Sequence, residues 1–264
     1  MPNDRFRKFI ARRTETSDLV PLIHTAPAFS FADITEGDNI EPRECKYFHK
    51  DLIYMFYGRP AMRTQVSELS RLRYSWPISF VIDPNASIPI TSAYPFDTGA
   101  FFNDFYRGIF SDDTDVKDFE LTGGVDSARK LVGIFYGDSQ TYLTSPSTKN
   151  DVGYSDFDFE AQGVHELAKR PPYSITQSTD KRPDERSTSI ELQTESSLRI
   201  QDVALGIVLP QQFMRLTPVI DALARWNIPN VETYKVLEFH ESGLWIGQLY
   251  QAVYRVYEKL GYIK

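Results

Sequence analysis

The sequence has one cysteine, Cys45, and no apolar run of the roughly 18 residues that a membrane-spanning helix needs. A single thiol excludes a disulfide framework and a structural zinc site made of several thiolates. The basic start, MPNDRFRKFIARRTET, lacks the apolar core and the small-residue cleavage site of a secretory signal. These absences predict a reduced, cytoplasmic protein that does not act in a membrane.

The motifs of several common enzyme classes are also missing. The chain contains no G-x-x-x-x-G-K-[ST] or G-x-G-x-x-G phosphate loop and no G-x-S-x-G nucleophile elbow. Its four histidines are scattered, and none is paired at i, i+4 as in zinc hydrolases. The acidic run at 112–115 has too few ligands at fixed spacing for a hard cation and is typical of a solvated loop. We therefore expect no bound metal.

The composition is that of a folded protein, with 264 residues, 41% hydrophobic and 25% charged. We expect a single domain over 1–264, with a basic N-terminal extension at 1–18 and a mobile surface loop at 171–189. The net charge of −7 disfavours a broad contact with nucleic acid. The 15 tyrosines and 18 phenylalanines are numerous enough to serve both a core and stacking on a flat ligand.

Hydrophobic periodicity predicts an α+β fold, because strands and helices are interspersed without a regular βαβ rhythm. Strands are expected at 19–25, 52–57, 78–83, 189–193, 203–209 and 231–239. Helices are expected at 29–37 (with Ser30 as N-cap), 103–110, 127–136, 211–226 and 244–260, the last amphipathic and C-terminal. The fold class is thus a mixed, largely antiparallel sheet with packed helices.

Polar side chains stand at or near the ends of three of the predicted strands. His24 and Thr25 close the first, Gly58-Arg59-Pro60 follows the second, and Glu191 lies inside the segment SIELQ. A carboxylate in an apolar strand is costly unless it is paired or used. For Glu191, a buried salt bridge to an arginine and exposure on an edge strand are the two ordinary explanations.

The order of these elements resembles the ADP-ribosyltransferase fold, which includes poly(ADP-ribose) polymerases and DNA-targeting toxins of the DarT type. The first strand with its polar end at 22–25 is followed by a short helix at 31–37 and by Ile-Glu-Pro at 40–42. The segment YMFYGRPAM at 54–62 is similar to the aromatic strand and turn of the toxin branch, and Glu191 occupies a position like that of the catalytic glutamate.

The resemblance implies how NAD is held, with NAD acting as a substrate. His24 and Thr25 would hydrogen-bond the nicotinamide amide or the ribose. Tyr57, with Tyr54 as second choice, would stack on the nicotinamide ring. Arg59 would hold the pyrophosphate through charge-assisted hydrogen bonds.

Glu191 would be the catalytic residue, hydrogen-bonding the nicotinamide ribose and stabilising an oxocarbenium-like transition state. Gln193 and Arg186 would support it, Arg186 either by pairing with Glu191 or by reaching a phosphate. The order Glu191-x-Gln193 reverses the Gln-x-Glu of arginine-directed transferases, and this leaves the acceptor, protein or nucleic acid, unassigned.

The predicted function is that of an NAD-dependent ADP-ribosyltransferase or NAD glycohydrolase with a toxin-like role in bacterial or phage conflict. Two alternatives stay open. One is a non-enzymatic module that binds a nucleotide or a protein, and the other is a transferase fold that has lost its activity. Oligomeric state is not predicted.

Overall fold

The computed structural model describes residues 3–62, 72–170, 186, 188–236 and 244–263. In these ranges the protein is a mixture of helices and strands whose pairings are largely antiparallel, which confirms the predicted class. The chain forms two compact units, each made of two separate segments. Unit 1 comprises Met1–Val20 and Pro89–Thr194, and unit 2 comprises Pro21–Ile88 and Glu195–Lys264. The predicted single domain stays a prediction, and each unit is described by itself.

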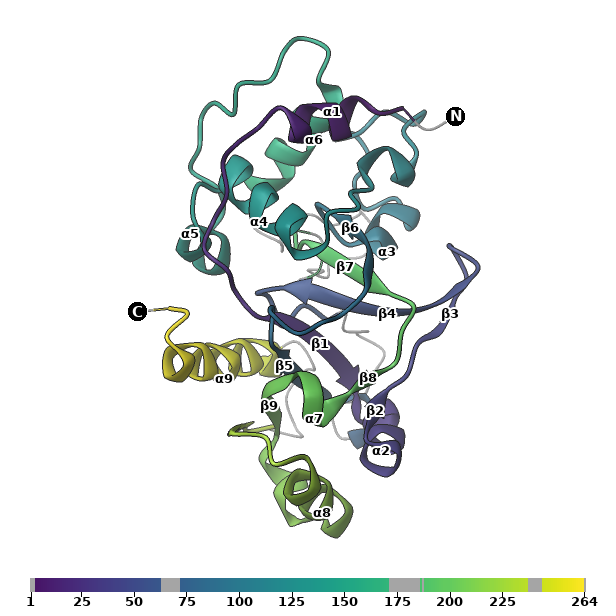
Figure 1. Ribbon diagram of the computed structural model, residues 1–264, viewed down its shortest axis with the longest axis vertical. Coiled ribbons are helices and arrows are strands. Elements are labelled where there is room, and N and C mark those ends of the chain that lie inside the picture. The colour runs from purple at the N-terminus through teal and green to yellow at the C-terminus, as the bar shows by residue number, and fades with distance from the viewer. Residues whose placement is uncertain (1–2, 63–71, 171–185, 187, 237–243, 264) are drawn as a thin grey trace. The chain divides into compact units, whose positions relative to one another are not determined.

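Unit 2 contains a sheet with the strand order β10-β9-β5-β1-β4-β3 (Figure 1). Every pairing in it is antiparallel except that of β10 with β9. The strands are β1 (Leu22–Pro27), β3 (Arg43–Cys45), β4 (Lys50–Tyr57), β5 (Pro77–Ile82), β9 (Ala204–Pro210) and β10 (Asn230–Tyr234). A separate short pair is made by β2 (Asn39–Ile40) and β8 (Leu198–Arg199). The strand predicted at 231–239 ends at Tyr234, and 237–239 lie outside the described residues.

Helices pack on this sheet through aromatic and small side chains. The rings of Phe31 and Trp226 each lie about 6 Å from that of Phe80 in β5 (6.1 and 6.0 Å), forming one aromatic core. A Cβ on Gly206 of β9 would lie 2.9 Å from Val256 Cγ1, so this glycine lets the C-terminal helix approach closely. The helices are α2 (Ala28–Gly37), α7 (Ile200–Val203), α8 (Thr217–Trp226) and α9 (Leu244–Leu260), with 3-10 turns η1 (Arg73–Ser75) and η4 (Gln211–Arg215).

The predicted N-cap at Ser30 is wrong, because α2 begins directly after β1. The N–H of Ala28 donates to the carbonyl of Trp76 at 2.8 Å, so backbone satisfies the start of the helix. The Ser30 hydroxyl instead accepts a hydrogen bond from Arg43. The predicted helix 211–226 is divided into η4 and α8, with Pro218 in the first turn of α8 where proline is tolerated.

Unit 1 contains a two-stranded antiparallel ladder surrounded by helices. In the ladder Tyr94 lies opposite Glu191. Its elements are β6 (Ile90–Tyr94), β7 (Glu191–Thr194), α1 (Arg5–Ala11), α3 (Thr98–Phe102), the 3-10 turn η2 (Val116–Phe119), α4 (Gly124–Phe135), α5 (Ser139–Thr144) and α6 (Phe159–Ala168).

The basic N-terminal segment is part of the core of unit 1. Helix α1 buries Phe6, Phe9 and Ile10, while Arg5 pairs with the buried carboxylate of Glu160. This apolar face explains why the basic residues stay on the outer side of the helix. The basic residues of α1 therefore form a helix face whose charges are partly ion-paired.

The helix predicted at 103–110 is wrong. Helix α3 ends at Phe102, and the following chain turns repeatedly, with Asp104 at φ 58° and Gly108 at φ 79°. These left-handed conformations break a helix. Two aromatic residues of this range, Tyr106 and Phe110, pack instead against the ring of Phe96.

Candidate functional site

The predicted site residues fall into two groups, one in each unit. Unit 2 holds His24, Thr25, Tyr54, Tyr57 and Arg59, and unit 1 holds Arg186, Glu191 and Gln193. Within each group the side chains are connected through hydrogen bonds or neighbouring strands, and the two groups are described in turn.

His24 and Thr25 point to opposite faces of β1, since side chains alternate along a strand. His24 Nδ1 lies 2.9 Å from the carbonyl oxygen of Tyr54. A carbonyl only accepts, so Nδ1 carries the proton and Nε2 is the acceptor of a neutral ring. Burial lowers the pKa of His24, which keeps the imidazole neutral at neutral pH. His24 thus offers one acceptor nitrogen.

The other face of the sheet carries a row of hydroxyl groups. Thr25 Oγ1 and Ser79 Oγ are 2.8 Å apart on paired strands. The Tyr54 hydroxyl donates to Cys45 Sγ at 2.8 Å. Tyr54 is half-buried, whereas Tyr57 has no exposed surface. Of the two rings predicted to stack on nicotinamide, only that of Tyr54 is partly accessible.

Arg59 follows β4 through a turn that only glycine adopts easily. Gly58 has φ 67°, its N–H donates to Pro21 O at 2.9 Å, and its carbonyl accepts from the Tyr257 hydroxyl at 2.8 Å. These bonds fix the backbone at the end of the strand. Arg59 is 7% exposed, so its guanidinium is held largely away from water.

In unit 1, Glu191 is fully buried and its carboxyl is held by three donors. Thr98 donates to it twice, from its N–H at 3.0 Å and from its hydroxyl at 2.8 Å. Gln193 Nε2 donates at 2.7 Å, as expected for side chains two residues apart on one face of a strand. Neither ordinary explanation of Glu191 applies: it is not exposed, and it forms no ion pair with any residue that the structure describes.

A second buried carboxylate, Asp97, lies beside Glu191. Asp97 caps α3 by accepting from the N–H of Gly99 at 2.9 Å, and Arg186 Nε lies 3.0 Å from its Oδ2. Arg186 therefore pairs with Asp97 and not with Glu191. Asp97 and Thr98 are not among the predicted site residues, although the segment Asp-Thr-Gly is a typical N-cap and turn signal.

The proximity of two carboxyls determines their protonation. Burial, and then the charge of Asp97, raise the pKa of Glu191 well above its ordinary value. Tyr94, opposite Glu191, also has a raised pKa because of burial and of the charges of Glu120 and Glu191. Glu191 is the carboxyl of the pair that keeps its proton to higher pH.

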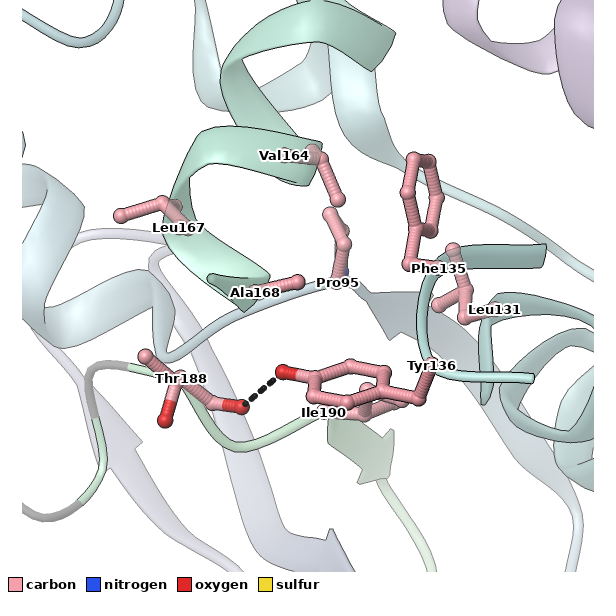
Figure 2. A pocket seen from close by; sticks show the side chains of 9 residues that line it. All are labelled: Pro95, Leu131, Phe135, Tyr136, Val164, Leu167, Ala168, Thr188 and Ile190. Atoms are coloured by element: carbon pink, nitrogen blue, oxygen red, sulfur yellow. Dashed lines mark hydrogen bonds between the residues drawn. The ribbon is translucent and has the colours of Figure 1, made fainter. Parts of the chain in front are cut away.

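Pro95 and Ile190, which lie near Asp97 and Glu191 in the chain, pack against side chains of α4 and α6. A cavity of about 10 Å³ lies beside Pro95 and Ile190 and is lined by side chains of α4 and α6 and by Thr188 (Figure 2). The Thr188 carbonyl accepts a hydrogen bond from the Tyr136 hydroxyl at 3.4 Å. Such a volume holds at most one water molecule. Because Ile190 precedes Glu191, the Glu191 carboxyl points away from this cavity.

The described residues contain no group of three or more histidine, cysteine, aspartate or glutamate side chains that could hold a metal ion. None of the helices in the described part of the chain is long and apolar enough to cross a membrane. Comparisons of the chain with protein-family models, with curated proteins and with solved structures found no match.

Proposed function

We propose that this protein cleaves the bond between nicotinamide and ribose in NAD and transfers ADP-ribose to an acceptor or to water. The observation that carries the proposal is the Glu191 carboxyl, fully buried, bonded by Thr98 and Gln193, and adjacent to the buried carboxyl of Asp97. Strongly perturbed carboxyls of this kind are concentrated at functional sites. The resemblance of the sequence to the ADP-ribosyltransferase fold supplies the reaction class.

The chemistry requires a carboxyl group near the ribose. As the glycosidic bond breaks, its electron pair leaves with nicotinamide and positive charge develops on the ribose ring. A preorganised carboxyl that bonds a ribose hydroxyl stabilises this charge, and Asp97 is the second carboxyl beside it. The acceptor then forms a bond to the ribose carbon and releases its proton. Gln193 and Thr98 orient Glu191 for this task.

Within unit 2, taken by itself, several polar groups have chemistry that suits parts of NAD. The neutral His24 ring can accept a hydrogen bond from the nicotinamide amide, and the Thr25 hydroxyl can bond a sugar oxygen or an amide. Arg59, held on a fixed turn, carries the charge that a pyrophosphate needs. Tyr54 is the ring with accessible surface for stacking.

The test is release of nicotinamide from NAD by wild type, by Glu191→Gln and by the matched control Glu195→Gln. Glu195 lies four residues later, on the surface, paired with Lys50. We expect wild type and Glu195→Gln to have the same rate, and Glu191→Gln to lose about 100-fold or more, the loss typical of removing one transition-state contact. Assays include water alone, a protein mixture and single-stranded DNA and RNA as acceptors. Equal rates for all three proteins, or no release by wild type with any acceptor, would refute the proposal.

The second candidate is a non-enzymatic binding module, which includes a transferase fold without activity. It is favoured by the complete burial of Glu191 and by the donors that already occupy its oxygens. In that case Glu191→Gln changes the melting temperature, and neither protein releases nicotinamide. For the toxin-like role, we expect expression of wild type to lower cellular NAD and expression of Glu191→Gln to leave it unchanged.

A further inference from the structure

A separate pocket of about 320 Å³ lies beside the C-terminal end of α3 in unit 1. Its volume is that of a small-ligand site. It is lined by three aromatic rings and by polar side chains of the following turns: Phe101, Asp104, Tyr106, Arg107, Phe110, Ser111, Asp112 and Thr114. None of these residues belongs to the Glu191 cluster.

The aromatic walls are held in place from behind. The rings of Phe101, Tyr106 and Phe110 lie 6.0 to 6.3 Å from one another. Each of them also packs against Phe96, at 4.9 to 5.7 Å. Their positions are therefore determined by the core of the unit, and the pocket is largely preformed.

Phe110 is further fixed by a glycine in α6. A Cβ on Gly163 would lie 2.3 Å from Phe110 Cε1, so the ring rests directly on the helix backbone. Any larger residue at 163 must displace the ring. The position of this wall of the pocket thus depends on Gly163.

The rim of the pocket is acidic. Asp104 and Asp112 line it, and their carboxylates form no hydrogen bond or ion pair with the residues that the structure describes. Asp113 and Asp115 follow in the same loop. Arg107 is the one cationic side chain among the lining residues described. Carboxylates and the faces of aromatic rings both attract cations.

We propose that this pocket binds an organic cation with a guanidinium or alkylated ammonium head. The aromatic residues supply part of the wall, and the two aspartates supply the compensating charge. An anion is repelled by this rim, and a neutral flat ligand makes no use of the carboxylates. A small metal ion needs more oxygen ligands than the two carboxylates and two hydroxyls at the rim provide. The aromatic wall of the pocket adds none.

The full chain is titrated with butylguanidinium, and binding is measured by calorimetry and by NMR chemical-shift changes. Butylurea, the neutral analogue of the same shape, is titrated in the same way. We expect saturable binding of butylguanidinium and none of butylurea over the same range. Asp104→Asn combined with Asp112→Asn, and separately Phe101→Leu, should each weaken binding about fivefold or more. Arg107→Ala should strengthen it by removing the competing cation.

The matched control is Asp113→Asn, which removes one charge from the same loop at a residue whose side chain does not line the pocket. It should leave the affinity nearly unchanged. Gly163→Ala tests the walls, and it should weaken binding because Phe110 is displaced. A blocked Gly-Arg-Gly peptide is compared with butylguanidinium to identify the source of the cation. Tighter binding of the peptide indicates a protein side chain, and equal or weaker binding indicates a free cation. Equal binding of butylurea, equal loss in Asp113→Asn, or the absence of saturable binding of every cation would overturn the proposal.

Discussion

The bond between the Thr98 hydroxyl and Glu191 offers a direct measure of the charge on Glu191. The hydroxyl donates to Oε1 at 2.8 Å, and both residues are buried. Thr98→Val keeps the shape of the side chain and the backbone bond at 3.0 Å but removes this donor. A hydrogen bond between neutral groups contributes about 1 kcal/mol to the free energy of unfolding, and one to a charged group about 1.5–3 kcal/mol. The cost of the substitution therefore depends on whether Glu191 is protonated.

The sign of the pH dependence follows from the pKa of Glu191, which burial and the charge of Asp97 raise well above the ordinary value of 4.5. The folded protein binds this proton more tightly than the unfolded chain. The contribution of the group to stability is complete below the ordinary glutamate pKa and is lost as pH rises through the folded-state pKa. Across that upper range the acceptor becomes charged, so the cost of Thr98→Val should increase with pH.

Urea unfolding of wild type and Thr98→Val between about pH 5 and about pH 9 measures this cost. Thr98→Ser, which keeps the hydroxyl, is the control. We expect a loss of about 1 kcal/mol in acid that increases toward about 2–3 kcal/mol. A loss that is already at its highest value near pH 5 and stays constant would show an ionised Glu191 and refute the reasoning. If Thr98→Ser loses as much as Thr98→Val, shape and not the hydroxyl determines the effect.

Three further predictions concern stability. Gly133→Ala places a Cβ 2.7 Å from the backbone of Thr16. Overpacking costs about 1–3 kcal/mol against about 1 kcal/mol of helix propensity gained, so the free energy of unfolding in urea should fall by up to about 2 kcal/mol. Gly247→Ala in α9, with nothing within 4 Å, should not lower it. Phe80→Ala opens a cavity under the aromatic core of unit 2 and should cost about 3–5 kcal/mol by the same measurement. Burial lowers the pKa of His165 below 6.5, so its contribution is lost as pH falls through the folded-state value; a stability–pH curve of His165→Gln parallel to that of wild type would contradict this.

Local signals in the sequence predicted most of the longer strands and helices. Apolar runs ended by glycine or proline indicated β4 and β9, and the helical stripe at 244–260 indicated α9. These segments have strong periodicity and are buried where the pattern requires. The strand at β6, by contrast, is short and mixed in character, and it is recognised only through its pairing with β7. Pairing between distant segments leaves no local signal.

The candidate site was predicted in part. Glu191 and Gln193 share a face because of simple strand alternation, which the sequence shows. The partner Thr98 is 93 residues away in the chain. The capping role of Asp97 is visible in the sequence, but its proximity to Glu191 is not. Arg186 was predicted to reach Glu191 or a phosphate. It pairs instead with Asp97, the N-cap residue of α3.

The charge balance of the cluster argues that Glu191 is more than a structural group. Arg186 compensates one carboxylate, that of Asp97, and the donors to Glu191 are neutral. An ionised second carboxylate is therefore uncompensated among the described residues, and burial penalises it. A glutamine at 191 would fill the same space at lower cost, since its amide could bond both Thr98 and Gln193 after a flip of the latter. The chain thus bears the cost of an acid where a neutral side chain suffices for packing. An acid so placed is suited to hold a proton or to bind the hydroxyls of a sugar that becomes positively charged, which is what cleavage of NAD requires.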